Sequence, residues 1–290
     1  MAGDHWDYDA GGGVFLWHSE ASATISGCHV FGNTARYGGA FYLYEGAPTL
    51  RANTISSNTA RDYGGGLFLY SSEAAIIANS IGSNTTDGAG GGMFTYYGDP
   101  TLSGNTISFN NAVGRGGGLY VQGGRSTFDN NVIADNEGSP GGGISMLACS
   151  PRLFHTTFAR NRSWQGSGIH VVGGYGSTPA LTNTILDSHT QAIYVGEGNT
   201  ATLNATLWHD NGTDFTGNLI HLNDLSGDPD FGPDGYRLGA NSAAIDAGVD
   251  AGVTTDIDGN RRPIGAGYDL GADERLLASY LPLVVRGYQP

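Results

Sequence analysis

Pairs of aromatic residues, with one other residue between the two members, recur at intervals of about 26 residues along the first half of the chain. Residues two apart on a β-strand point to the same side, so each pair would add two rings to one face of a sheet. A wide aromatic face can hold sugar rings or pack against another protein, whereas stacking within a sheet stabilises it by up to about 1 kcal/mol per pair. We favour a binding role, because contiguous apolar surface is costly in water. The candidate residues are Phe15, Trp17, Tyr42, Tyr44, Phe68, Tyr70, Phe94, Tyr96, Tyr120 and Tyr194.

A short acidic loop near the C-terminus offers the oxygen ligands that calcium prefers. Asp256, Asp258 and Asn260 alternate with other residues, and Gly259 lies among them. Alternating oxygen ligands are typical of calcium loops, although the downstream glutamate of an EF-hand is missing. The alternative is an Asx-rich turn, in which these side chains accept hydrogen bonds from the backbone. We favour the turn, and Ca²⁺ is the single cofactor that the sequence suggests.

The charge composition limits the class of partner. All 13 basic residues are arginines, and the net charge is −14. This balance argues against nucleic acid, because binding to the phosphate backbone depends on clustered cations. No apolar run reaches the roughly 20 residues that a membrane-spanning helix needs. The partners left are a surface polysaccharide or further copies of the chain.

The aromatic pairs lie on short strands that a coil repeat must position. Glycines precede each strand, as in Gly38-Gly39-Ala40 and Gly64-Gly65-Gly66, and permit a tight corner with positive φ. The apolar positions of these strands alternate with the aromatic ones, so they are predicted to point inward. They form two columns: Val14, Phe41, Leu67, Met93, Leu119, Ile144, Ile169 and Ile193, then Leu16, Leu43, Leu69, Thr95, Val121, Met146, Val171 and Val195.

A second signature, an apolar residue followed three positions later by asparagine, returns later in each coil. It runs from Val30 and Asn33 to Phe158 and Asn161. Stacked asparagines can hydrogen-bond along a column at the spacing of β-strands, and asparagine tolerates the left-handed region at a corner. In a seventh copy the asparagine is predicted to be lost, at Ser188 after Ile185. A second column is predicted to hold Asn53, Asn79, Asn105, Asn131 and Asn183.

These periods predict an all-β chain that forms a right-handed, single-stranded parallel β-helix. The glycines and the lack of a 3.6-residue period exclude a helical solenoid. About eight or nine coils of 23 to 27 residues would occupy residues 1–225, as a rod of about 40 Å. Residues 226–275 are predicted to form a C-terminal cap on the last coil, and residues 276–290 an apolar extended tail.

The glycine and Asn signatures of residues 11–190 resemble the repeats of the polymorphic outer-membrane protein family, which carry GGA before an aliphatic residue and FxxN. This chain prefers GGG and Ile-x-x-Asn. The succession within residues 226–275 is similar to the closing segment of bacterial secreted β-helix proteins that carry an anchoring or sorting tail. Both resemblances imply an extracellular or cell-surface location. We therefore expect that a signal sequence, which is not found in this chain, has been removed.

Enzymes that share this fold provide the alternative to a binding role. Lyases of the pectate-lyase-like superfamily hold calcium with an Asp cluster beside a Lys or Arg on the same sheet, and hydrolases of the fold use grouped aspartates. This chain has no lysine, and no paired aspartates recur in adjacent coils beside the aromatic residues. The sequence therefore favours a non-catalytic protein, although long loops can also supply catalytic residues.

The two cysteines are predicted to be free. Cys28 lies in the first coil and Cys149 in the sixth, so strand spacing separates them by about 24 Å, far beyond disulfide reach. We expect both thiols to be mostly buried.

Together these features predict a structural or adhesive element. Open ends of a solenoid expose backbone groups and apolar interior, which favours head-to-tail growth into filaments. The apolar tail is expected to pack as a strand on its own solenoid, and the alternative is that it adds a strand to a neighbouring molecule. The tail residues concerned are Tyr280, Leu281, Leu283, Val284 and Val285. A carbohydrate-binding module is the second hypothesis, and a polysaccharide lyase or hydrolase is the third.

Overall fold

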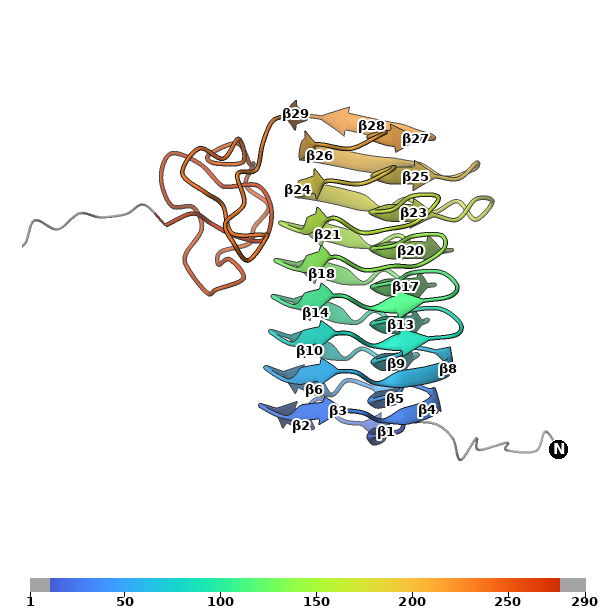
Figure 1. Cartoon of the computed structure of the whole chain (residues 1–290). Coiled ribbons are helices and arrows are strands. Elements are labelled where there is room, and N and C mark those ends of the chain that lie inside the picture. Colours follow the sequence, from blue (N-terminus) through green and yellow to red (C-terminus); the bar gives the residue numbers. More distant parts are fainter. Residues whose placement is uncertain (1–10, 277–290) are drawn as a thin grey trace, which may run out of the picture.

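The chain folds into a rod of stacked β coils with an irregular C-terminal segment beside it (Figure 1). This computed structural model describes residues 11–276. All 29 strands of the described residues lie within the rod, and every pairing between them is parallel. The predicted parallel β-helix is therefore confirmed.

The first sheet carries the strands that follow the glycines. Its nine strands stack in sequence order, so eight turns separate the first from the last. The glycine corner before each strand is close to other backbone: a Cβ added at Gly38, where φ is +61°, would lie 2.0 Å from the carbonyl oxygen of Phe41. The strands of sheet 1 are β1 (Val14–Ser19), β5 (Phe41–Gly46), β9 (Leu67–Tyr70), β13 (Met93–Tyr96), β17 (Leu119–Gln122), β20 (Ile144–Leu147), β23 (Ile169–Val171), β25 (Ile193–Val195) and β27 (Phe215–Thr216).

The second sheet has two rows of strands, which join where β24 (Ala180–Asp187) and β26 (Ala201–His209) are long enough to belong to both. One row holds β2 (Thr24–Ser26), β6 (Thr49–Arg51), β10 (Ala75–Ile77), β14 (Thr101–Ser103), β18 (Thr127–Asp129), β21 (Arg152–Phe154) and β28 (Leu219–Leu222). The other row holds β3 (His29–Phe31), β7 (Thr54–Ser56), β11 (Ser80–Gly82), β15 (Thr106–Ser108), β19 (Val132–Ala134), β22 (Thr157–Ala159) and β29 (Leu225–Ser226).

A third, shorter sheet covers only the N-terminal coils. It leads the chain back towards the glycines of the next coil. Its strands are β4 (Thr34–Tyr37), β8 (Thr59–Tyr63), β12 (Thr85–Thr86) and β16 (Asn111–Ala112).

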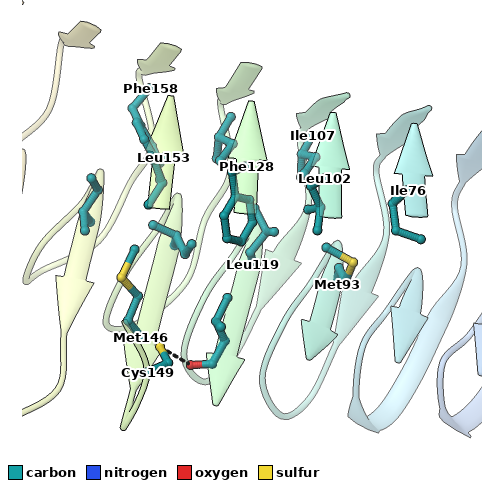
Figure 2. Packing of buried hydrophobic residues seen from close by; sticks show 14 of the residues in the cluster. Ile76, Met93, Leu102, Ile107, Leu119, Phe128, Met146, Cys149, Leu153 and Phe158 are labelled. Atoms are coloured by element: carbon teal, nitrogen blue, oxygen red, sulfur yellow. Dashed lines mark hydrogen bonds between the residues drawn. The ribbon is translucent and has the colours of Figure 1, made fainter. Parts of the chain in front are cut away.

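The interior of the rod is apolar and built from the predicted columns. Along sheet 1, Met93 pairs with both Leu67 and Leu119, and the same register continues to Ile193. Figure 2 shows how such side chains from successive coils meet inside the rod. Cys149 is buried there, and burial raises the pKa of its thiol to about 12. The prediction of a mostly buried thiol is wrong for Cys28, which is free but exposed because the first coil has no described coil beneath it.

The asparagines form continuous hydrogen-bonded ladders. Each asparagine donates both its side-chain amide and its own backbone N–H to the side-chain oxygen of the next asparagine, as Asn84 does to Asn110 Oδ1 at 3.0 Å for both bonds. The same amide also donates to a backbone carbonyl of the preceding coil, as Asn84 Nδ2 does to the carbonyl of Ile55 at 2.9 Å. These bonds satisfy backbone groups at corners that lie inside the rod. The first ladder includes Asn33, Asn58, Asn84, Asn110, Asn136 and Asn161.

In the seventh coil the sequence assignment was wrong by one position. Phe158 pairs with Leu186 rather than Ile185, so His189 takes the ladder position assigned to Ser188. Its Nε2 accepts from Asn161 Nδ2 at 3.3 Å, and Asn211 Oδ1 accepts from its backbone N–H at 3.0 Å. Asn183 is likewise displaced from the second ladder, because the shift moves it to the outer corner.

His189 makes the ladder sensitive to acid. To imitate an asparagine, its ring must accept through Nε2 and donate through Nδ1, which lies 3.3 Å from Asn211 Oδ1. Burial lowers the pKa of His189 from 6.5 to about 4, so the folded state holds fewer protons than the unfolded state. The stability that neutral His189 contributes is fully present above pH 6.5 and is lost as the pH falls from 6.5 to about 4. This loss amounts to about 3 kcal/mol.

Replacement of His189 by asparagine is expected to remove this part of the acid sensitivity. An asparagine accepts and donates at any pH in this range, so the variant should lose less stability than the unsubstituted protein between pH 7 and pH 4. Urea unfolding at both pH values measures the difference. His29, which is exposed on β3, gives the matched control His29→Asn. Equal losses in His189→Asn and in the unsubstituted protein would contradict this role.

Residues 227–276 lie along the flank of the rod, whereas we predicted a cap on the last coil (Figure 1). They pack on the outer face of sheet 2 through two apolar clusters. Leu238, Ala244 and Leu270 contact Ile185 and Leu207. The other cluster brings Ala272 to Val132, Ala134 and Ala159.

Two asparagines at one corner of the rod hold this segment. Asn130 Nδ2 donates to the carbonyl of Thr255 at 2.7 Å. Asn183 Nδ2 donates to the carbonyl of Val249 at 2.7 Å, and Asn183 Oδ1 accepts from the Val249 N–H at 2.8 Å. Between them lies His155, whose pKa burial and the nearby Arg262 lower to about 3. The same corner holds only glycine or alanine in the first four coils, at Gly27, Ala52, Ala78 and Gly104.

Polar residues occupy the interior position at the C-terminal end of the rod. His221 pairs with Leu203 in an interior column, yet its Nδ1 lies 2.7 Å from Asp224 Oδ2. The indole of Trp208 donates to the same oxygen at 3.1 Å. A second copy stacked on this end would have to bury this polar group, which is costly.

Candidate functional site: an aromatic groove on sheet 1

The inner outward-facing column of sheet 1 is a stack of rings. Its centroids lie 5.2 Å apart from Phe15 to Tyr42, 5.0 Å from Tyr42 to Phe68, 5.2 Å from Phe68 to Phe94 and 4.8 Å from Phe94 to Tyr120. We predicted an exposed column, but Phe68, Phe94 and Tyr120 expose only 5%, 2% and 6% of their surface. Neighbouring rings and side chains cover these three, which therefore form a floor.

The outer column stacks in the same way and stays accessible. Tyr44 and Tyr70 lie 5.0 Å apart with their planes within 5°, and Tyr70 and Tyr96 lie 5.3 Å apart. Trp17 continues this column at 5.2 Å from Tyr44. Tyr44, Tyr70 and Tyr96 are half-buried, and the rings of Tyr70 and Tyr96 form one side of the groove.

The opposite side consists of residues that we did not predict. Tyr37 ends β4 and Tyr63 ends β8, each directly before the glycines of the next coil. Tyr37 stacks on Phe68 at 5.5 Å, and Tyr63 packs edge-on against Phe94 at 5.0 Å. The sequence signal that we missed is the position directly before the glycines. In successive coils it is occupied by Tyr37, Tyr63, Ala89 and Arg115.

Floor and sides enclose an open groove of about 660 Å³. It follows the rod axis, because strands of successive coils, from β5 to β17, contribute to it. The lining is aromatic with polar hydroxyl edges, and Arg115 provides its one cation. The lining residues, all of them among the residues described, include no carboxylate: Tyr37, Tyr42, Tyr63, Phe68, Tyr70, Ala89, Phe94, Tyr96, Arg115, Tyr120 and Gln122.

Tyr120 closes the floor beside Arg115. Burial raises the pKa of Tyr120 above its ordinary value of 10, while Arg115 opposes the shift. The hydroxyl therefore stays protonated at neutral pH and can both donate and accept a hydrogen bond.

Beyond Tyr120 the aromatic column is interrupted. Ser145 follows it, with its hydroxyl 3.2 Å from His170 Nδ1. His170 stacks on Tyr194 at 5.3 Å, and burial lowers the pKa of His170 to about 4. Tyr194, which we included in the binding face, therefore lies outside the groove. Phe15, Trp17 and Tyr44 extend the face at its other end without lining the groove.

The acidic loop forms a hydrogen-bonded turn. Asp256 Oδ1 accepts from the backbone of Asp258 and Asn260 at 3.0 and 2.7 Å, and its Oδ2 accepts from the Asn260 amide and from the Glu274 backbone. Asp258 accepts two hydrogen bonds from Arg237. Asp273, which we did not predict, joins Asp256 and Asp258 within 4.8 Å. Asp256 and Asp258 already have these partners, as expected for an Asx-rich turn.

Two further predictions concern the tail and the membrane. Tyr280, Leu281, Leu283, Val284 and Val285 lie outside the described residues. Within residues 11–276, the structure contains no helix with the length and apolarity needed to cross a membrane.

Fold and site together define a right-handed parallel β-helix protein with an aromatic groove along one sheet. The chain belongs to the family described as "Right handed beta helix region", whose family model matches residues 12–185, more than half of the 290 residues. Searches among curated proteins and among solved structures found no match to this chain.

Proposed function

We propose that this protein is a non-catalytic β-helix that binds a polysaccharide in the aromatic groove of sheet 1. The observation that supports it is the lining, in which rings from successive coils follow one another at about 5 Å along the rod axis. A sugar chain laid along the axis would meet a ring in every coil. The tyrosine hydroxyls and Gln122 would then bond its hydroxyl groups.

An adhesive role outside the cell fits this groove. An open groove that follows the rod across successive coils suits one chain of a large polymer better than a small ligand. The repeats that resemble those of polymorphic outer-membrane proteins, and the closing segment that is similar to those of secreted β-helix proteins, support an extracellular or cell-surface location.

Cleavage of the bound chain has less support than binding. Glycoside hydrolysis requires two carboxyl groups across the scissile bond, and lyases of this fold require acidic calcium ligands. The described residues that line the groove supply neither. Release of reducing sugars or of unsaturated products from a polysaccharide panel would overturn the non-catalytic proposal.

The accessible tyrosines provide the test of binding. The double variant Tyr70→Ala, Tyr96→Ala removes two adjacent rings from the side of the groove and leaves the buried floor intact. We expect affinity for the bound polysaccharide to fall about 10- to 100-fold, as for the loss of two stacked rings. Affinity electrophoresis in gels containing neutral or acidic polysaccharides measures the change.

A matched control removes two aromatic rings elsewhere. Phe109 and Tyr175 expose 65% and 57% of their surface and lie away from the groove lining. The variant Phe109→Ala, Tyr175→Ala should bind as the unsubstituted protein does. If both double variants bind equally well, the groove is not the binding site.

Self-association is a second proposal, supported by the first coil. Val14, Leu16, Ile25 and Val30 belong to the interior columns but are only partly buried. Head-to-tail stacking would bury the polar group of Trp208, His221 and Asp224 at the C-terminal end. We therefore favour contact between the first coils of two copies. Negative-stain microscopy and sedimentation at high concentration would reveal the assemblies, and a monodisperse monomer would contradict the proposal.

A further inference from the structure

A second hollow, of about 410 Å³, lies at the turns that lead from sheet 1 into sheet 2. Arg125, Ser150 and Thr178 come from the turns of three successive coils. Thr127, Arg152 and Ala180 come from the starts of β18, β21 and β24. Thr127 and Arg152 are direct partners across adjacent strands, so the two arginines reach the hollow from neighbouring coils.

The two guanidinium groups of this hollow have no ion-pair partner among the residues described. Several other arginines of this acidic chain are paired, as Arg160 is with Asp135 and Arg237 with Asp258. The carboxylate of Asp99 accepts a hydrogen bond from the backbone N–H of Arg125 and does not line the hollow. Two like charges that line one hollow repel each other, so an anion bound between them would relieve this repulsion.

The hydroxyl groups of the hollow add neutral donors. Ser150 Oγ accepts from the Thr178 N–H at 2.9 Å and from Thr178 Oγ1 at 3.1 Å. Its own proton is therefore available to donate to a ligand. Guanidinium groups are donors only, so the charged part of the lining offers no acceptor that would repel an oxyanion.

We propose that this hollow binds a tetrahedral oxyanion, sulfate or phosphate, either free or as an ester on a sugar. Arginine binds such anions through parallel N–H···O bonds, and two arginines with a serine could occupy several oxygens at once. The volume far exceeds that of one oxyanion, which leaves room for the sugar that carries it. This site lies apart from the aromatic groove and does not depend on what the groove binds.

Titration calorimetry with the whole chain tests the site. Sodium sulfate and sodium phosphate are the probes for the free anion, with sodium chloride at equal ionic strength as the reference. Dextran sulfate tests the ester, with unmodified dextran as its reference. We expect oxyanion binding to weaken about 10-fold in Arg125→Gln or Arg152→Gln and about 100-fold in the double variant.

Arg51→Gln provides the matched control, because Arg51 is also exposed on sheet 2 and its loss changes the net charge equally. Binding of inorganic sulfate or phosphate that the double variant loses and the control keeps supports a free-anion site. The same pattern with dextran sulfate alone supports a sulfate-ester site. Binding no stronger than that of chloride and dextran, or an equal loss in Arg51→Gln, would overturn the proposal.

Discussion

Replacement of Asn110 by alanine is expected to lower the free energy of unfolding by about 4 kcal/mol. Asn110 Oδ1 accepts from the backbone and the amide of Asn84, and Asn110 Nδ2 donates to the Ile81 carbonyl and to Asn136 Oδ1, all at 2.9 to 3.0 Å. Alanine removes all four bonds and leaves the Asn84 N–H buried without a partner. Each buried polar group left unsatisfied costs about 1–3 kcal/mol.

The neighbouring Asn111 gives the control. It lies next to Asn110 in sequence but is exposed at the start of β16. Asn111→Ala should change stability by less than about 0.5 kcal/mol, as most surface substitutions do. Urea midpoints, followed by circular dichroism at the β minimum, compare the two variants. Similar midpoints would mean that the ladder is not a main source of stability.

The rod could be predicted because its interior repeats in every coil. One apolar column or one asparagine column contains enough copies to fix the period, and the pairings from Val14 to Ile193 follow it. The seventh coil was misassigned for a local reason. Residues 172–179 lengthen the turn before β24, so counting from one coil to the next placed Ile185 where Leu186 lies.

The candidate site was predicted only in part. Alternation along a strand shows that Phe68 and Phe94 point outward, but not that Tyr37 and Tyr63 cover them from another part of the coil. Burial of an outward residue depends on neighbours that no single strand contains. For the same reason, periodicity could not show that the groove ends at Arg115.

The position of the C-terminal segment also lay beyond the sequence. Its turns and acidic residues carry no repeat, so nothing in them selects the flank of the rod over its end. A signal existed in the rod itself. The corner that holds glycine or alanine in the first four coils holds Asn130, His155 and Asn183 in the next three, and these residues hold the segment or pack against it.

Replacement of Glu274 by glutamine is expected to release this segment from the rod. The pair of Arg262 and Glu274 is fully buried, with Arg262 Nη1 2.7 Å from Glu274 Oε2. Glu274 also accepts from the backbone of Ile264 and of Asp269, at 2.7 and 3.1 Å. The variant leaves the cation of Arg262 buried without this anion, which costs about 3–5 kcal/mol. The coils, which have their own ladders and core, should stay folded.

Limited proteolysis with mass spectrometry separates local from global loss, because a released segment is cut within residues 227–276 while the coils remain intact. Arg237→Gln is the matched control. It breaks solvent-exposed ion pairs with Asp234 and Asp258 in the same segment. An exposed pair contributes at most about 1 kcal/mol, so this variant should resist the protease as the unsubstituted chain does. Resistance in Glu274→Gln would show that the apolar contacts with Ile185 and Leu207 hold the segment without the buried pair. Cleavage throughout the coils would instead show that segment and rod unfold as one unit.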